Sequence, residues 1–113
     1  MVNSGNTPSK LPTIFSGPVT SEKENLTLNL SSPDDNSLVF ASSLLVQGET
    51  SPQALVIVNW NDNTETVTAG NDGNFSDTIK LDSGVNDLVV AAFDKDGNSQ
   101  QEKRTIFYST EKL

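Results

Sequence analysis

The chain has 113 residues and a formal net charge of −8, with only seven Lys and Arg. Its length and a hydrophobic share of 34% fit one domain with one modest core. The negative charge disfavours nucleic acids and anionic membrane surfaces as partners, because both would be repelled. The absence of cysteine and histidine removes disulfides, thiolate nucleophiles, and the commonest general base and transition-metal ligand.

Residues 1–24 are rich in Ser, Thr, Asn, Gly and Pro and show no sustained periodicity, which predicts a flexible N-terminal linker or arm. Only Leu11, Ile14, Phe15 and Val19 interrupt this composition with larger apolar side chains. No stretch approaches the roughly 20 apolar residues that cross a bilayer, and residues 1–10 lack the apolar centre of a signal peptide. We therefore expect no direct membrane insertion, and we expect any export signal or anchor to lie outside this chain.

From Asn25 onward, short apolar alternations separated by turn residues about every ten positions predict an all-β sandwich or barrel. The expected strands are 26–30, 44–48, 54–60, 64–68, 75–81, 88–93 and 100–108, with a short piece at 38–40. Asn71-Asp72-Gly73 predicts a hairpin between the fourth and fifth of the seven main strands. Gly73 and Gly97 each follow Asp at turn positions that favour positive φ. Residues 111–113 form a C-terminal tail.

Strand alternation also predicts which side chains face the core. The expected inward set is Leu26, Leu28, Leu30, Leu44, Val46, Ala54, Val56, Val58, Phe75, Ile79, Leu81, Leu88, Val90, Ala92, Ile106 and Tyr108. Asp77 shares this parity, and an unpaired buried carboxylate is costly, so a β-bulge or an exposed strand end is expected there.

An ordered series of short segments carries a family resemblance. The segments are Val46-Gln47-Gly48-Glu49-Thr50, residues 52–59, Asp72-Gly73-Asn74-Phe75-Ser76, Leu81 with Gly84 and Asn86, residues 90–94 with Gly97-Asn98, and Tyr108. This series resembles the bacterial immunoglobulin-like domains typified by the non-catalytic domain B of glucodextranase. The resemblance implies an immunoglobulin-like, two-sheet antiparallel sandwich of about seven strands over residues 25–110. Gln53 and Trp60 depart from it, because the family usually has Gly at both places.

The resemblance also implies a function, that of a non-catalytic structural or spacer module of a larger bacterial extracellular or cell-surface protein, with neighbouring domains as its partners. The alternative is a carbohydrate-binding accessory module of a polysaccharide-active enzyme. Trp60, the only tryptophan, favours this alternative if it faces solvent, because exposed aromatic rings stack on sugars. Partial burial at the sandwich rim is the other interpretation of Trp60.

No residue pattern predicts an enzyme. The fifteen acidic residues fall mainly in turns and on polar strand faces, and the serines have no recognisable activating base. Asp94-x-Asp96-Gly97-Asn98 begins like a calcium loop, but Thr105 stands where a bidentate Glu is needed, so a hairpin turn is favoured. We therefore expect no catalytic residue, no metal and no cofactor. Asn86 and Asp94 are expected to bond loop amides through their side chains.

Inward parity for Val56 and Val90 forces their sequence neighbours onto the opposite face of the same sheet. The expected interface consists of Leu55, Ile57, Val89, Ala91 and Phe93, with Phe107 at its edge. A patch of this kind is seldom left bare. Its expected cover is the apolar part of the N-terminal arm, a second copy of the chain, or a neighbouring domain.

Overall fold

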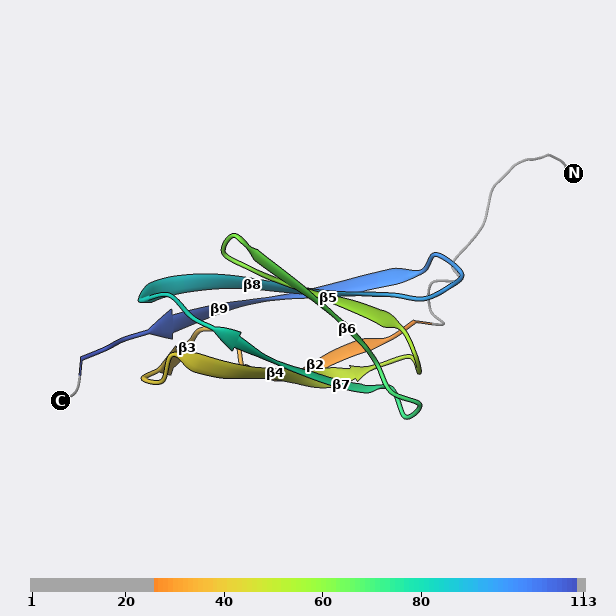
Figure 1. The fold of residues 1–113 in the computed structure, drawn as a ribbon, viewed down its shortest axis with the longest axis horizontal. Coiled ribbons are helices and arrows are strands. Elements are labelled where there is room, and N and C mark those ends of the chain that lie inside the picture. Colours follow the sequence, from red (N-terminus) through yellow and green to blue (C-terminus); the bar gives the residue numbers. More distant parts are fainter. Residues whose placement is uncertain (1–25, 112–113) are drawn as a thin grey trace, which may run out of the picture.

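The computed structural model describes residues 26–111 and has, within this range, eight strands and no helix. The strands are β2 (Leu28–Ser32), β3 (Ser37–Val39), β4 (Ser43–Thr50), β5 (Leu55–Trp60), β6 (Asn63–Thr68), β7 (Asn74–Lys80), β8 (Gly84–Phe93) and β9 (Ser99–Tyr108). They form a three-stranded sheet in the order β2-β4-β7 and a five-stranded sheet in the order β3-β9-β8-β5-β6 (Figure 1). All strand pairs are antiparallel except β3 with β9. No helix of this part is long and apolar enough to cross a membrane.

The all-β, two-sheet sandwich expected from the sequence is confirmed, but the predicted hairpin at Asn71-Asp72-Gly73 is wrong. The turn itself exists: Gly73 has a φ of 84°, and its backbone N–H donates to the carbonyl of Gly70. However, β6 pairs with β5 in one sheet, whereas β7 pairs with β4 in the other. The turn is therefore a corner between sheets. A local turn signal fixes the backbone reversal and not the sheet that the next strand joins.

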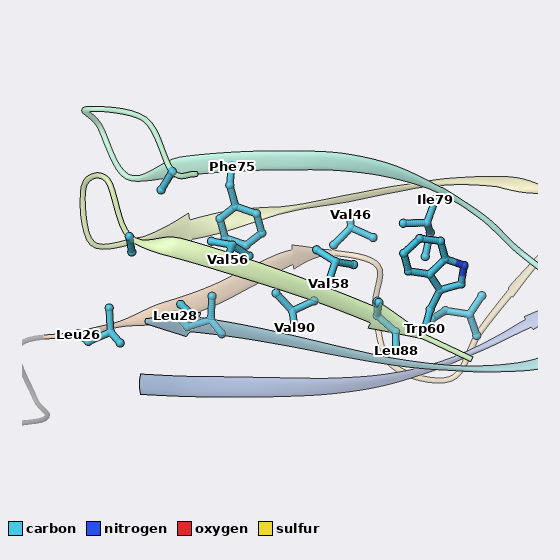
Figure 2. Close-up of a cluster of buried hydrophobic side chains, with 14 of the residues drawn as sticks. Leu26, Leu28, Val46, Val56, Val58, Trp60, Phe75, Ile79, Leu88 and Val90 are labelled. Atoms are coloured by element: carbon cyan, nitrogen blue, oxygen red, sulfur yellow. The ribbon is translucent and has the colours of Figure 1, made fainter. Parts of the chain in front are cut away.

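The core lies between the two sheets (Figure 2). Every residue expected to face inward is buried, except Leu30, Leu44 and Tyr108, which are partly buried and pack against the core. Trp60 and Ala69 are buried as well; Trp60 has the parity of Val56 and Val58, although neither residue was in the expected inward set. Side-chain alternation therefore sets which face of each strand is covered, as expected for a sandwich.

Asp77 contradicts the prediction of a bulge or exposed strand end. It lies in the middle of β7, in regular register opposite Val46, between the buried Phe75 and Ile79. Its Oδ2 atom is buried and has no hydrogen-bond partner in the described part of the chain. The strand keeps its register because β7 buries two large apolar side chains, and a slip of one residue would turn both to solvent.

Gly48 lies inside β4, where the backbone makes a close approach to neighbouring atoms. A Cβ atom at this position would lie 2.5 Å from the carbonyl oxygen of Asn29 and 2.9 Å from Cζ of Phe75. The Phe75 ring therefore occupies the space that a larger residue at position 48 would fill. The strand nevertheless continues through Gly48 to Thr50.

Candidate functional site

The outer face of the five-stranded sheet carries an apolar cluster on its neighbouring strands β5 and β8. Leu55 is the register partner of Phe93, and Ile57 is the register partner of Ala91. Residues opposite each other in an antiparallel pair project to the same face, so these four side chains form two adjacent rows. Val89, opposite Asn59, begins the next row. The structure thus brings together five of the six residues expected at the interface.

These five residues, which we call the β5–β8 patch, are covered to different degrees. Leu55 is 42% exposed and Phe93 is 38% exposed, whereas Ile57, Val89 and Ala91 are half-buried. Beside Phe93 and Ala91, the backbone and polar side chains of residues 99–101 line a hollow of about 350 Å³. The patch is therefore most open at the end of the sheet formed by Leu55 and Phe93.

Phe107, expected at the edge of this patch, lies elsewhere on the same face. Its register partners are Val85 on β8 and Leu38 on β3. The row formed by Asp87 and Thr105 separates it from Val89. Leu38 is 60% exposed and Val85 is 57% exposed, so the three residues form a second apolar cluster. Sequence reasoning missed Val85 because it directly follows a strong turn signal, and β8 begins earlier than expected.

Trp60 is not a solvent-facing sugar platform. Its side chain is buried at 5% exposure, and the indole N–H donates a 2.8 Å hydrogen bond to the carbonyl oxygen of Lys80. In Figure 2 the ring lies beside Ile79 and Leu88, within the core. The indole thus ties the end of β5 to the end of β7 across the two sheets. Of the two interpretations of Trp60, burial agrees with the structure, whereas a sugar platform would need a solvent-facing ring; a tryptophan whose N–H finds an acceptor is readily buried.

A polar groove lies over the outer face of the three-stranded sheet. Its volume is about 760 Å³, and its lining residues are Asn29, Ser31, Gln47, Gly48, Glu49, Thr68, Gly70, Asn74, Phe75 and Ser76. Among the described residues, the side chains of Asn29 and Gln47 have no hydrogen-bond partner, so their amide donors and acceptors face solvent. The sequence did not predict this groove, since its residues come from four strands and a corner.

The oxygen atoms of the Asp94 carboxylate accept hydrogen bonds from other residues of the same turn. Oδ1 accepts the backbone N–H groups of Asp96 and Asn98, each at 2.9 Å, and Oδ2 accepts the side-chain amide of Asn98 at 2.9 Å. The hydrogen bonds from Asn98 are the main reason that the pKa of Asp94 is lowered. Gly97 completes the turn with a φ of 89°. In the described residues, no group of three or more Asp, Glu, His or Cys side chains could hold a metal ion.

Asn86 is the polar centre of the opposite end of the sandwich. The side chain is fully buried, and its Oδ1 accepts the Asp82 backbone N–H at 2.9 Å and the Asn61 side-chain amide at 2.7 Å. Its Nδ2 donates to the carbonyls of Asp82 and Gly84. The structural roles expected for Asn86 and Asp94 are thus confirmed.

The fold is that of an immunoglobulin-like β-sandwich whose two sheets each have an outward face. Residues 26–110 match glucodextranase domain B, and the chain belongs to that family. No curated protein matches the chain significantly.

Solved structures support the fold. The fibronectin(III)-like modules of Clostridium thermocellum CbhA superpose with a TM-score of 0.58 at 16% identity, covering 74% of this chain and 96% of that one. XAC1771, a carbohydrate acetylesterase from Xanthomonas citri, has a TM-score of 0.54 at 23% identity, covering 74% of this chain and 19% of that one. An engineered protein superposes with a TM-score of 0.57 at 14% identity, covering 87% of this chain and 22% of that one. In the last two cases the chain corresponds to about one-fifth of a longer protein.

Proposed function

We propose that this chain is a non-catalytic spacer and interaction module of a larger bacterial extracellular or cell-surface protein, and that its β5–β8 patch contacts a neighbouring domain. The observation that carries this proposal is the patch itself, in which apolar side chains from two neighbouring strands occupy consecutive rows of an outward face. Partly exposed aromatic and aliphatic side chains in one contiguous area are typical of protein interfaces.

The small exposed area of the patch supports a tethered partner rather than a free one. Five side chains, three of them half-buried, expose far less than the roughly 800 Å² that each partner contributes to a stable interface. A covalent tether supplies a local concentration in the millimolar range and allows so small a contact to form. Membership of the glucodextranase domain B family and the likeness to modules of larger proteins are consistent with this role.

Hydrophobic-dye fluorescence tests the exposed patch. We expect the chain to bind dye and Phe93→Ser to lower that binding at least twofold, because this change removes the one aromatic ring of the patch. Phe107→Ser, at an equally exposed phenylalanine of the second cluster, is the matched control and should retain the signal of the β5–β8 patch. Equal dye binding by Phe93→Ser and the unaltered chain would refute this interface.

The polar groove favours a second candidate function, the binding of a neutral carbohydrate chain. Its open amide and hydroxyl side chains can exchange hydrogen bonds with sugar hydroxyls, and no Lys or Arg lines it. Glucodextranase and a carbohydrate acetylesterase are among the proteins to which this chain or its family is similar. With no aromatic platform at Trp60, the expected affinity is weak, on the order of millimolar.

Nuclear magnetic resonance titration with neutral α- and β-glucan oligosaccharides separates this candidate from the spacer role. Carbohydrate binding predicts shifts of the Asn29 and Gln47 side-chain amides that Gln47→Ala weakens. Gln101→Ala, on the five-stranded sheet, is the matched control and should leave the titration unchanged. Absence of shifts at the groove with both glucan classes would eliminate the carbohydrate candidate and leave the spacer proposal intact.

A further inference from the structure

We propose that Glu65 and Asp77 form an acid-closed clasp between the edge strands β6 and β7. The two carboxyl groups share one proton taken from solvent at acidic pH and repel each other at neutral pH. This margin of the sandwich therefore opens more readily as pH rises. The inference is independent of the partner or ligand of the module.

The fold places the two side chains face to face. Strand β6 is an edge of the five-stranded sheet, β7 is an edge of the three-stranded sheet, and the two strands are in contact. Glu65 is the register partner of Val58, and Asp77 is the register partner of Val46. Both valines are fully buried, so both side chains start from the inward parity of their strands; Asp77 is half-buried, whereas Glu65 is exposed at the margin of the sandwich. Figure 1 shows the chain passing from β6 to β7 along this margin.

The hydrogen bonding of the pair is incomplete when both groups are ionised. Strands β6 and β7 are in contact, and a hydrogen bond between the two carboxyl groups is the first cause of the raised pKa of Glu65. Oδ2 of Asp77 is nevertheless buried without a partner among the described residues. A carboxylate has no donor to offer, so only protonation of one group produces an O–H that the other can accept. A pair of facing carboxyl groups that holds one proton is the expected result.

No positive charge relieves the pair from the surrounding strands. Lys80 on β7 is exposed and lies on the outward parity, and β5 has no charged residue. The carboxylates of Glu49 on β4 and Asp87 on β8 are exposed on outer faces. In residues 26–111, the one ion pair joins Arg104 to Glu102 on β9, which is separated from β6 by two strands.

The pH dependence follows from the direction of one pKa. The hydrogen bond to Asp77, then desolvation and the Asp77 charge, raise the pKa of Glu65 above its ordinary value. The folded state therefore binds this proton more tightly than the unfolded state does. The contribution of the pair to stability is fully present below the ordinary Glu pKa and is lost as pH rises through the raised pKa.

Glu65→Gln in the full chain tests the clasp by thermal melts between about pH 4 and pH 7.5. Near pH 7.5 we expect the variant to melt about 2–5 °C above the unaltered chain, because it removes repulsion and supplies an amide donor for Asp77. Near pH 4 the difference should vanish. Asp77→Asn should show the same trend. The melting temperature of the double variant should rise by less than the sum of the two single-variant rises.

Glu49→Gln makes the same charge change on an outward face of β4 and should give a small difference that does not vary with pH. Backbone hydrogen exchange of residues 63–68, corrected for intrinsic rate, should slow on acidification in the unaltered chain but not in Glu65→Gln. The clasp is overturned if Glu65→Gln and Glu49→Gln shift the melting temperature alike at every pH. Glu65→Gln decides the matter even if Asp77→Asn fails to fold.

Discussion

Asn86 shows how one side chain can replace several backbone partners. Its amide group fills both donor and acceptor roles inside the end of the sandwich, joining the turn at Asp82 to the turn at Asn61. Asn61 adopts a φ of 54°, a conformation that Asn tolerates better than most residues. The two asparagines therefore hold two turns of different sheet connections in one arrangement.

Asn86→Ala should lower the free energy of unfolding by about 2–3 kcal/mol, because it removes a buried side chain whose part-buried hydrogen bonds satisfy the N–H of Asp82 and the carbonyls of Asp82 and Gly84. Chemical denaturation measures the change. Asn29→Ala is the matched control, since Asn29 is exposed and its side chain makes no hydrogen bond within the described chain, and it should cost less than about 0.5 kcal/mol. A similar small loss for both variants would show that the Asn86 network does not stabilise the fold.

The role of an individual residue was predictable from the sequence where its near neighbours in the chain determine its hydrogen bonds. Asn86 and Asp94 flank the strand expected at 88–93, so their bonds to loop amides follow from local chain geometry, although β8 begins earlier and includes Asn86. The partners of Trp60 and Asp77 depend instead on which strands face each other across the core, and strand alternation does not contain that information. The indole N–H finds its acceptor on β7, and the Asp77 carboxyl meets Glu65 of the other sheet.

At the scale of elements, the β8–β9 hairpin has its turn built around one carboxylate. Asp94→Ala removes the acceptor of three N–H groups and should lower the melting temperature near neutral pH by about 2–5 °C. Because hydrogen bonds lower the pKa of Asp94, its contribution is present above the ordinary Asp pKa and is lost as pH falls through the lowered one. The difference between variant and unaltered chain should therefore shrink on acidification.

The matched control for this turn is Asp96→Ala, whose side-chain carboxylate accepts no hydrogen bond in the described structure although its backbone N–H donates to Asp94. It should leave the melting temperature almost unchanged. Millimolar Ca²⁺ should have no effect on the unaltered chain, since the oxygens of Asp94 already accept three N–H groups. If Asp94→Ala melts below the unaltered chain by the same amount at every pH, the carboxylate is not the stabilising group.

Strand positions were largely predictable, whereas their pairing was not. Alternation located β5 and β8 and placed Leu55 and Phe93 on the outer face, so the β5–β8 patch followed from parity once the two strands were taken as neighbours. The same reasoning placed Phe107 at the edge of the β5–β8 patch, whereas it lies in the second cluster with Val85 and Leu38. The row in which Phe107 lies depends on the register between β8 and β9. The turn at residues 94–98 sets that register, and side-chain alternation alone does not predict it.

For the whole molecule, the remaining question is what covers the β5–β8 patch. The apolar residues Leu11, Ile14, Phe15 and Val19, expected as one cover, lie outside the described residues. The linker, sandwich and tail boundaries expected near residues 24 and 110 likewise remain predictions. Removing residues 1–22 tests whether the β5–β8 patch is covered by this segment of the same chain or by a neighbouring domain.

We expect the shortened chain to match the full chain in melting temperature, dye binding and sedimentation, because the proposed occupant is a tethered domain and Leu26, the first core residue, is retained. Phe93→Ser should then lower dye binding equally in both lengths, which provides the internal control. A lower melting temperature together with new dye binding in the shortened chain, abolished by Phe93→Ser, would contradict this expectation. It would assign the patch to residues 11–19, because removal of a docked apolar segment both destabilises the fold and exposes the surface that the segment had covered.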